Sequence, residues 1–190
     1  MDYNLILYIG TALIVSGFLL FLFCEMKERE IDRNSDIIAS KVIHEDGLPI
    51  ILDAFFRFNA HGELINEINL INYINIALKN PHCTFSLWSK KFDIISKYFK
   101  DHDKPKNLIL IYSNPKINHI LETVPKYFDK TFNNVQEDLN KDRQNCSGQK
   151  CRDCLLCYKF DTTQIIVEKV KTYGRKKLTN QLEGKNETTI

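Results

Sequence analysis

The sequence has almost no net charge, because 26 lysine and arginine residues stand against 24 aspartate and glutamate residues in a chain of 190. Proteins that bind nucleic acid usually carry a basic excess, so the composition does not indicate a nucleic-acid partner. The chain also lacks the hydrophobicity of a multi-span membrane protein, since its mean hydropathy is −0.27. Hydrophobic residues nevertheless make up 44% of it, which excludes a wholly disordered chain.

Charge is absent altogether from one N-terminal stretch. The 21 uncharged residues 3–23 would form a helix about 32 Å long, which matches a bilayer core of roughly 30 Å. We expect a transmembrane helix over residues 1–24, and a signal-like segment is the alternative. Basic residues follow this stretch and none precedes it. The positive-inside rule therefore predicts a single-pass membrane protein whose C-terminal domain lies in the cytoplasm.

The rest of the chain reads as a connector, a domain and a tail. We predict a charged helical connector over residues 25–45, a domain over 46–171 and a polar tail over 172–190. Within the domain, strand-like apolar runs alternate with stretches of helical periodicity. The expected strands are 49–58, 83–88, 107–112, 131–135 and 163–170, and the expected helices are 63–79 and 90–100.

This alternation predicts an α/β fold. Connections of such length favour parallel strands with right-handed crossovers, in an open sheet or a partial β/α barrel. In the helix expected over 63–79, asparagine recurs every third residue, and we expect a solvated face there, with a polar contact ladder as the alternative. Cys83 lies in an apolar run and is expected to be a buried thiol. We find no internal repeat.

Polar residues at the carboxyl ends of the expected strands are candidates for function, since ligands of parallel α/β folds gather there. His61 is a candidate for proton transfer and Glu63 for binding an amine. The alternative is that Glu63 stabilises the first helical turn while His61 is a surface residue. Further cofactor-binding candidates at these ends are Asn59, Gly62, Ser89, Lys90 and Asn114.

Four of the six cysteines occur within twelve residues, in the spacing C-x4-C-x2-C-x2-C: Cys146, Cys151, Cys154 and Cys157. Stable disulfides are not expected in a cytoplasmic domain, and thiolates this close together favour a metal that neutralises them. The pattern predicts a C-terminal metal knuckle. Zinc suits a compact four-cysteine site, whereas C-x2-C-x2-C also resembles the binding loop of a [4Fe-4S] cluster, so both metals stay open.

Taken together, these motifs resemble the phage gene product 88 family over roughly residues 45–171. Members show an arginine-containing strand, a turn that ends in Gly-Asp or Gly-Glu, a helix, Asn-Pro, an aromatic strand that ends in Thr/Ser-Lys, and a cysteine-rich C-terminal part. The matching positions here are Arg57, His61, Gly62, Glu63, Asn80, Pro81, Ser89, Lys90 and the four late cysteines. The resemblance implies a protein of phages and mobile elements with no established activity.

The family is in turn distantly similar to radical S-adenosylmethionine enzymes. In those enzymes a Gly-Gly-Glu turn binds the amino group of the cofactor, and residues 61–63 would stand at that place. They also require an earlier C-x3-C-x2-C motif, whereas this chain has only Cys24 before residue 80. The resemblance therefore implies a metal-binding or structural role, with an iron–sulfur enzyme using S-adenosylmethionine, or a truncated relative of one, as the alternatives.

Overall fold

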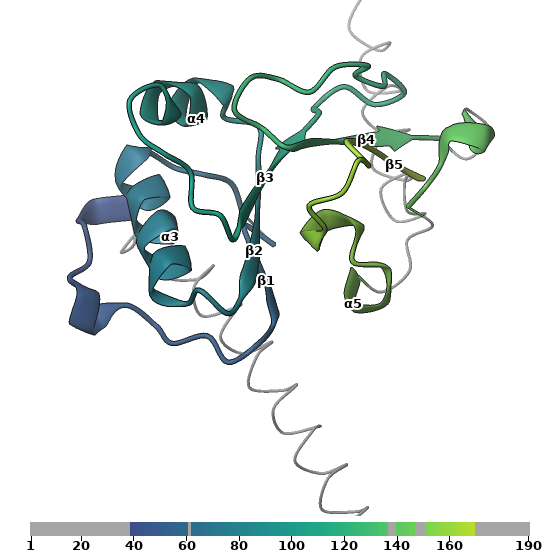
Figure 1. Ribbon diagram of the computed structural model, residues 1–190. Helices are drawn as coiled ribbons and strands as arrows, with labels where there is room; N and C mark the ends of the chain where they lie inside the picture. The colour runs from purple at the N-terminus through teal and green to yellow at the C-terminus, as the bar shows by residue number, and fades with distance from the viewer. Residues whose placement is uncertain (1–38, 61, 137–139, 147–150, 170–190) are drawn as a thin grey trace, which may run out of the picture. The chain divides into compact units, whose positions relative to one another are not determined.

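The computed structural model describes residues 39–60, 62–136, 140–146 and 151–169 (Figure 1). The predicted membrane helix, most of the predicted connector and the tail lie outside these residues. Among the residues that the structure describes, no helix is long and apolar enough to cross a membrane.

The described strands form one parallel sheet in which their order follows the sequence, β1-β2-β3-β4-β5. Each strand is short, and all strand residues except Phe55 are buried or half-buried, as expected for parallel strands rich in apolar residues. The predicted parallel α/β architecture is thus confirmed. The strands are β1 (Phe55–Phe58), β2 (Thr84–Ser89), β3 (Leu108–Ser113), β4 (Lys130–Val135) and β5 (Ile165–Lys169).

Two helices of ordinary length accompany the strands, α3 (Glu67–Lys79) and α4 (Phe92–Phe99). Single turns form at η1 (Glu45–Gly47), η2 (Lys141–Arg143), α5 (Cys151–Cys154) and η3 (Leu156–Tyr158). The described chain divides into two compact units. The first comprises residues 39–87 and 93–108, and the second comprises 88–92 and 109–169.

Stacked aromatic rings form the core of the first unit. Phe58 of β1 lies between Tyr73 of α3 and Phe85 of β2, with ring centroids 4.3 and 5.1 Å away. In Figure 1, α3 and α4 lie on the same side of β1 and β2. Cys83, just before β2, is fully buried as predicted. Burial, followed by the charge of Asp53, raises the pKa of its thiol to about 12, so this cysteine is an inert packing residue.

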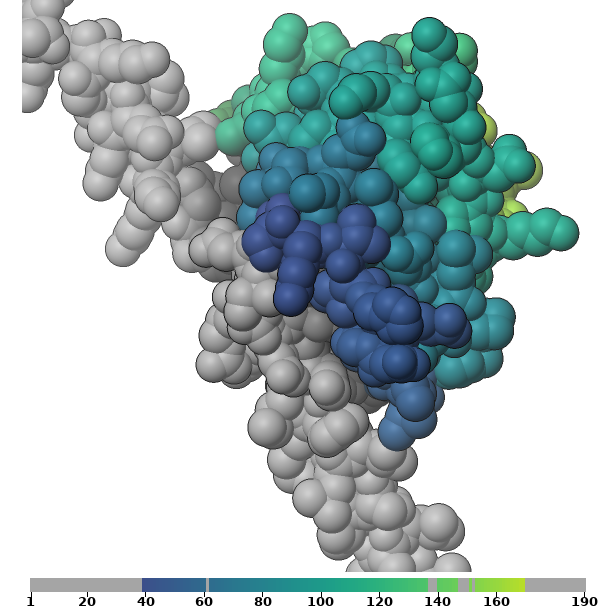
Figure 2. Space-filling view, turned by 90° about the vertical axis from the view of Figure 1, so that its left-hand side faces the viewer, coloured from purple at the N-terminus to yellow at the C-terminus, as the bar shows by residue number. Residues whose placement is uncertain are grey.

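Residues 39–53, which we call the strap, precede β1 and form almost no regular structure. Figure 2 shows strap residues, in purple and blue, at the surface of the molecule beside its teal part. The expected strand over 49–58 is therefore wrong in its first half. The backbone N–H of Ile51 donates to Oδ1 of Asn80, 2.7 Å away. The side chain of Asn80 thus supplies the hydrogen-bond acceptor that a neighbouring strand would otherwise provide.

Asparagine side chains along α3 hold the strap in place. Asn72 accepts from the N–H of Ile43 and donates to the carbonyl of Lys41, both at 2.8 Å. Asn66 donates to the carbonyl of Ala39 at 2.9 Å, while its own oxygen accepts from the N–H of Asn69 and so caps the helix.

The expectation of a solvated asparagine face on this helix was wrong. Asn69 and Asn72 are fully buried. The three-residue spacing of the asparagines could not reveal this burial, because an asparagine side chain can form its hydrogen bonds with the strap as well as with water. The helix itself starts at Glu67 rather than at Glu63, since Asn66 is its N-cap.

The second unit contains a small apolar core and few helical residues. Ile109 and Ile111 of β3, Phe132 of β4 and Ile166 of β5 form this core together with Cys157. The chain crosses from β3 to β4 through an irregular loop, residues 114–129, in place of a helix. Apolar side chains of the cysteine-rich segment, Leu156 and Tyr158, pack against this core and cover it.

Candidate metal and ligand sites

The turn after β1 carries several of the predicted site residues. Asn59 is buried in a left-handed conformation, φ 58°, and its Oδ1 accepts from the hydroxyl of Tyr73 at 3.0 Å. Glu63 accepts from the N–H of Leu64 at 2.8 Å through Oε1. Gly62 is exposed, and a Cβ built there would meet no atom within 4 Å. His61 lies outside the described residues, so the proposed pairing of His61 with Glu63 is not tested.

The residues predicted after β2 lie where α4 begins. Ser89 is buried, and its Oγ accepts from the N–H of Lys91 at 2.9 Å. This bond stabilises the sharp turn from β2 into α4, which is a structural use of the hydroxyl. Lys90 stands inside the same turn. Ser89 therefore has a clear role in local folding, and a cofactor contact for Ser89 or Lys90 stays a prediction.

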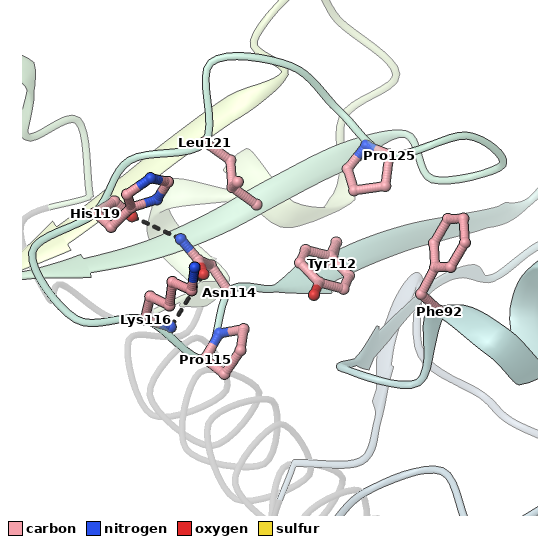
Figure 3. A pocket seen from close by; sticks show the side chains of 8 residues that line it. All are labelled: Phe92, Tyr112, Asn114, Pro115, Lys116, His119, Leu121 and Pro125. Atoms are coloured by element: carbon pink, nitrogen blue, oxygen red, sulfur yellow. Dashed lines mark hydrogen bonds between the residues drawn. The ribbon is translucent and has the colours of Figure 1, made fainter.

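Asn114, predicted at the end of β3, lines a pocket of about 320 Å³ in the second unit. The pocket opens where β3 ends, which is the edge at which parallel α/β proteins bind ligands. Its walls are mainly apolar and aromatic, and Figure 3 shows the side chains. The lining residues are Phe92, Tyr112, Asn114, Pro115, Lys116, His119, Leu121 and Pro125.

A network of asparagines fixes the wall that follows β3. Asn114 donates to the carbonyl of His119 at 2.6 Å and accepts from the N–H of Lys116 at 3.0 Å, as the dashed lines in Figure 3 show. Its amide also donates to Oδ1 of Asn133, 3.0 Å away, and that oxygen accepts from the N–H of Leu121. Hydrogen bonds within the protein thus fix the shape of this wall.

The residues at the two ends of this pocket differ in character. Phe92 and Tyr112 contribute aromatic rings on one side, and both rings contact Phe128 behind them, with centroids 6.4 and 5.3 Å away. In Figure 3, Lys116 and His119 lie at the opposite end from Phe92. None of the eight lining residues is acidic.

The acidic group nearest in sequence to this pocket, Glu122, is engaged elsewhere. Arg143 binds both of its carboxylate oxygens, at 2.7 and 2.9 Å. The Arg143 hydrogen bonds, and more weakly the charges of Arg143 and His119, hold the pKa of Glu122 below its usual value. Within the pocket lining itself, no carboxylate competes with a ligand for Lys116 or His119.

Sequence reasoning found Asn114 but missed the other pocket residues. A signal existed, because Lys116 and His119 follow the predicted strand end directly. What the sequence could not show is that Phe92, twenty residues before Tyr112, contributes a ring to the same pocket.

The four late cysteines fall into two groups. Cys157 is buried in the apolar core of the second unit, and Cys146 packs against that core. The N–H of Cys146 donates to the carbonyl of Val167 at 3.1 Å, which fixes this residue along β5. Cys151 and Cys154 occupy the two ends of α5, the first exposed and the second half-buried. None of the four forms a disulfide.

A metal would need at least three of these thiols at one point. In the described part of the chain, no three His, Cys, Asp or Glu side chains are grouped closely enough to hold a metal. The donor chemistry nevertheless fits zinc or an iron–sulfur cluster, since both take thiolate ligands. Metal binding by the four cysteines stays a prediction.

Comparison with known proteins was informative at the level of the family. A model of the gene product 88 family matches residues 40–177. No curated protein and no solved structure matches the chain. The comparisons give no support to a similarity with radical S-adenosylmethionine enzymes. The match covers most of the chain and all of the described α/β fold, so this protein belongs to the gene product 88 family.

Proposed function

We propose that this protein is a metal-binding domain of the gene product 88 type, held at a membrane by residues 3–23, with a binding or structural role. The observation that carries the metal proposal is the presence of four cysteines within twelve residues, none of them in a disulfide. The uncharged N-terminal segment and the basic residues that follow it support a single-pass anchor with a cytoplasmic domain.

The position of Cys157 suggests what such a metal would do. This thiol lies in the core formed by β3, β4 and β5, whereas Cys151 and Cys154 lie on a helix of only four residues. A helix this short has little stability of its own. A metal bound by Cys157 and by both α5 cysteines would fasten α5 to the sheet, and Cys146 beside β5 would supply the fourth ligand.

An iron–sulfur enzyme is the second candidate. The C-x2-C-x2-C spacing of Cys151, Cys154 and Cys157 favours it, because ferredoxin loops use this spacing. Such a cluster would supply one-electron chemistry, and S-adenosylmethionine would then be the cofactor to test near Glu63. Anaerobic purification separates the candidates. Colourless protein with one zinc per chain supports the structural role, whereas brown protein that contains iron and sulfide supports the enzyme.

Replacement of Cys154 by serine tests the metal proposal. We expect this variant to lose its bound metal and to unfold at a lower temperature, with a loss of several kcal/mol in stability, because metal binding adds directly to folding. Metal analysis and a thermal melting curve measure the two effects.

Cys83→Ala is the matched control, since Cys83 is buried in the first unit, away from the cysteine-rich segment in the sequence. This control should keep its full metal content even if it melts earlier. Wild-type protein without zinc or iron after anaerobic purification would contradict the metal proposal.

Deletion of residues 1–24 tests the membrane anchor. We expect the full-length protein to sediment with membranes and the shortened protein to stay in the supernatant, because the deletion removes the uncharged segment and leaves a charged domain. Fractionation of cell lysates by ultracentrifugation measures the difference. Full-length protein that stays soluble without detergent would show that the segment is not an anchor.

A further inference from the structure

The metal proposal does not account for the pocket at the end of β3. It is lined by residues 112–125 and by Phe92, and none of the four late cysteines contributes to it. Its volume of about 320 Å³ lies at the lower end of the range for small-molecule sites, roughly 300 to 1,000 Å³. The pocket therefore suits a ligand with one or two rings.

We propose that this pocket binds a small planar aromatic ligand that carries an anionic group, such as a mononucleotide or an aromatic carboxylate. The ring of the ligand would lie between Phe92 and Tyr112 on one side and Pro125 and Leu121 on the other. Flat apolar walls of this kind favour stacking. Figure 3 shows Tyr112 below Leu121 and Pro125, with Phe92 closing one end.

The opposite end of the pocket determines the charge of the ligand. Lys116 and His119 both line it, and both side chains are donors that suit phosphate or carboxylate oxygens. No lining residue is acidic, and Arg143 already neutralises Glu122. A cationic ligand would meet the like charge of Lys116 and no carboxylate in the lining, whereas an anion would find a charged donor there.

Hydrogen bonds within the protein hold the backbone at the Lys116 and His119 end of the pocket. Asn114 ties the N–H of Lys116 to the carbonyl of His119 through its own side chain. Asn118 is left-handed, φ 61°, and its N–H donates to the carbonyl of Asn134 at 2.9 Å. The loop is thus anchored at both ends, so it would lose little conformational entropy when a ligand binds.

Calorimetric titration of the full-length protein in detergent tests the proposal. Adenosine 5′-monophosphate and benzoate are the two anionic aromatic probes, and their relative affinities separate a nucleotide from an aromatic acid. We expect saturable binding of at least one of them. If the nucleotide binds, adenosine and ribose 5-phosphate should each bind at least about tenfold more weakly than it does. Adenosine lacks the anionic phosphate, and ribose 5-phosphate lacks the aromatic base.

Two variants locate the binding. Lys116→Gln removes the charge of an exposed side chain and should weaken binding about tenfold while the melting temperature stays unchanged. Phe92→Ala removes a half-exposed ring that also contacts Phe128, so it should weaken binding about tenfold and lower the melting temperature slightly. Lys106→Gln, an exposed lysine outside the pocket, should bind as the wild type does. The proposal fails if neither probe binds, if ribose 5-phosphate binds as tightly as the nucleotide, or if Lys116→Gln binds as tightly as Lys106→Gln.

Discussion

Replacing Asp161 by alanine should lower the free energy of unfolding by about 3 kcal/mol, because the change leaves a buried ammonium without its counter-charge. The side chain of Lys130 on β4 is only 2% exposed, and its Nζ lies 2.7 Å from Oδ1 of Asp161. The Lys130 ammonium also donates a hydrogen bond to the carbonyl of Thr163, at 2.7 Å. Urea denaturation of the variant and the wild type measures the difference.

The double variant Lys130→Met/Asp161→Ala separates loss of the ion pair from loss of packing. Methionine carries no charge, so the buried position no longer needs a counter-charge and most of the lost stability should return. An unchanged stability in Asp161→Ala alone would show that Lys130 does not depend on this carboxylate.

The pH dependence provides a second check on the same pair. The hydrogen bond from Lys130, followed by its charge, holds the pKa of Asp161 below its ordinary value. A carboxyl group with a lowered pKa stabilises the fold fully above its unfolded-state pKa, and this contribution disappears as the pH falls through the folded-state pKa. The stability difference between wild type and Asp161→Ala should therefore be full at neutral pH and shrink below about pH 4.

Asn80→Ala should cost a similar amount, about 3 kcal/mol, because one side chain serves three backbone groups there. The Oδ1 of Asn80 accepts from the N–H of Ile51, and its Nδ2 donates to the carbonyls of Pro49 and Ile76. Asn80 is 1% exposed, so water cannot replace these bonds. The loss would loosen the strap from α3, and hydrogen exchange at Ile51 should speed up with it.

Asn75→Ala, on the same helix, is the matched control for this prediction. Asn75 is only half-buried, so its replacement by a better helix former should change stability by less than about 0.5 kcal/mol. Equal effects of the two variants would show that the strap is not held by Asn80 but merely lies beside it.

The strap shows where sequence reasoning about this fold stops. Residues 49–53 look like the start of a strand because Ile50, Ile51 and Leu52 have high strand propensity. Ile50 and Leu52 are in fact well exposed, and only Ile51 is buried. The competing hydrogen-bond partner is the side-chain amide of Asn80, 29 residues after Ile51, which takes the place of a neighbouring strand. Propensity carries no information about such a distant side chain.

The candidate sites were predictable to different degrees. The rule that ligands gather at strand ends led to Asn114, and the structure places a pocket at that point. The same rule led to Ser89, whose hydroxyl bonds to the backbone of its own turn, and to Asn59, whose side chain bonds to Tyr73 of α3. The rule selects polar side chains at this edge of the sheet, but whether one of them lines a pocket or bonds to the protein itself depends on the tertiary structure.

The sequence by itself determined the parallel α/β class, the approximate places of the five described strands and of α3 and α4, the burial of Cys83 and membership of the gene product 88 family. These follow from hydrophobic period and motif order, which are local properties of the chain. Only the tertiary structure decided that buried asparagines on α3 hold the strap, that Lys130 is buried against Asp161, and that Phe92 and Tyr112 share a pocket. Each of these joins residues that are far apart in the sequence, and a buried polar side chain is stable only where the fold brings it a partner.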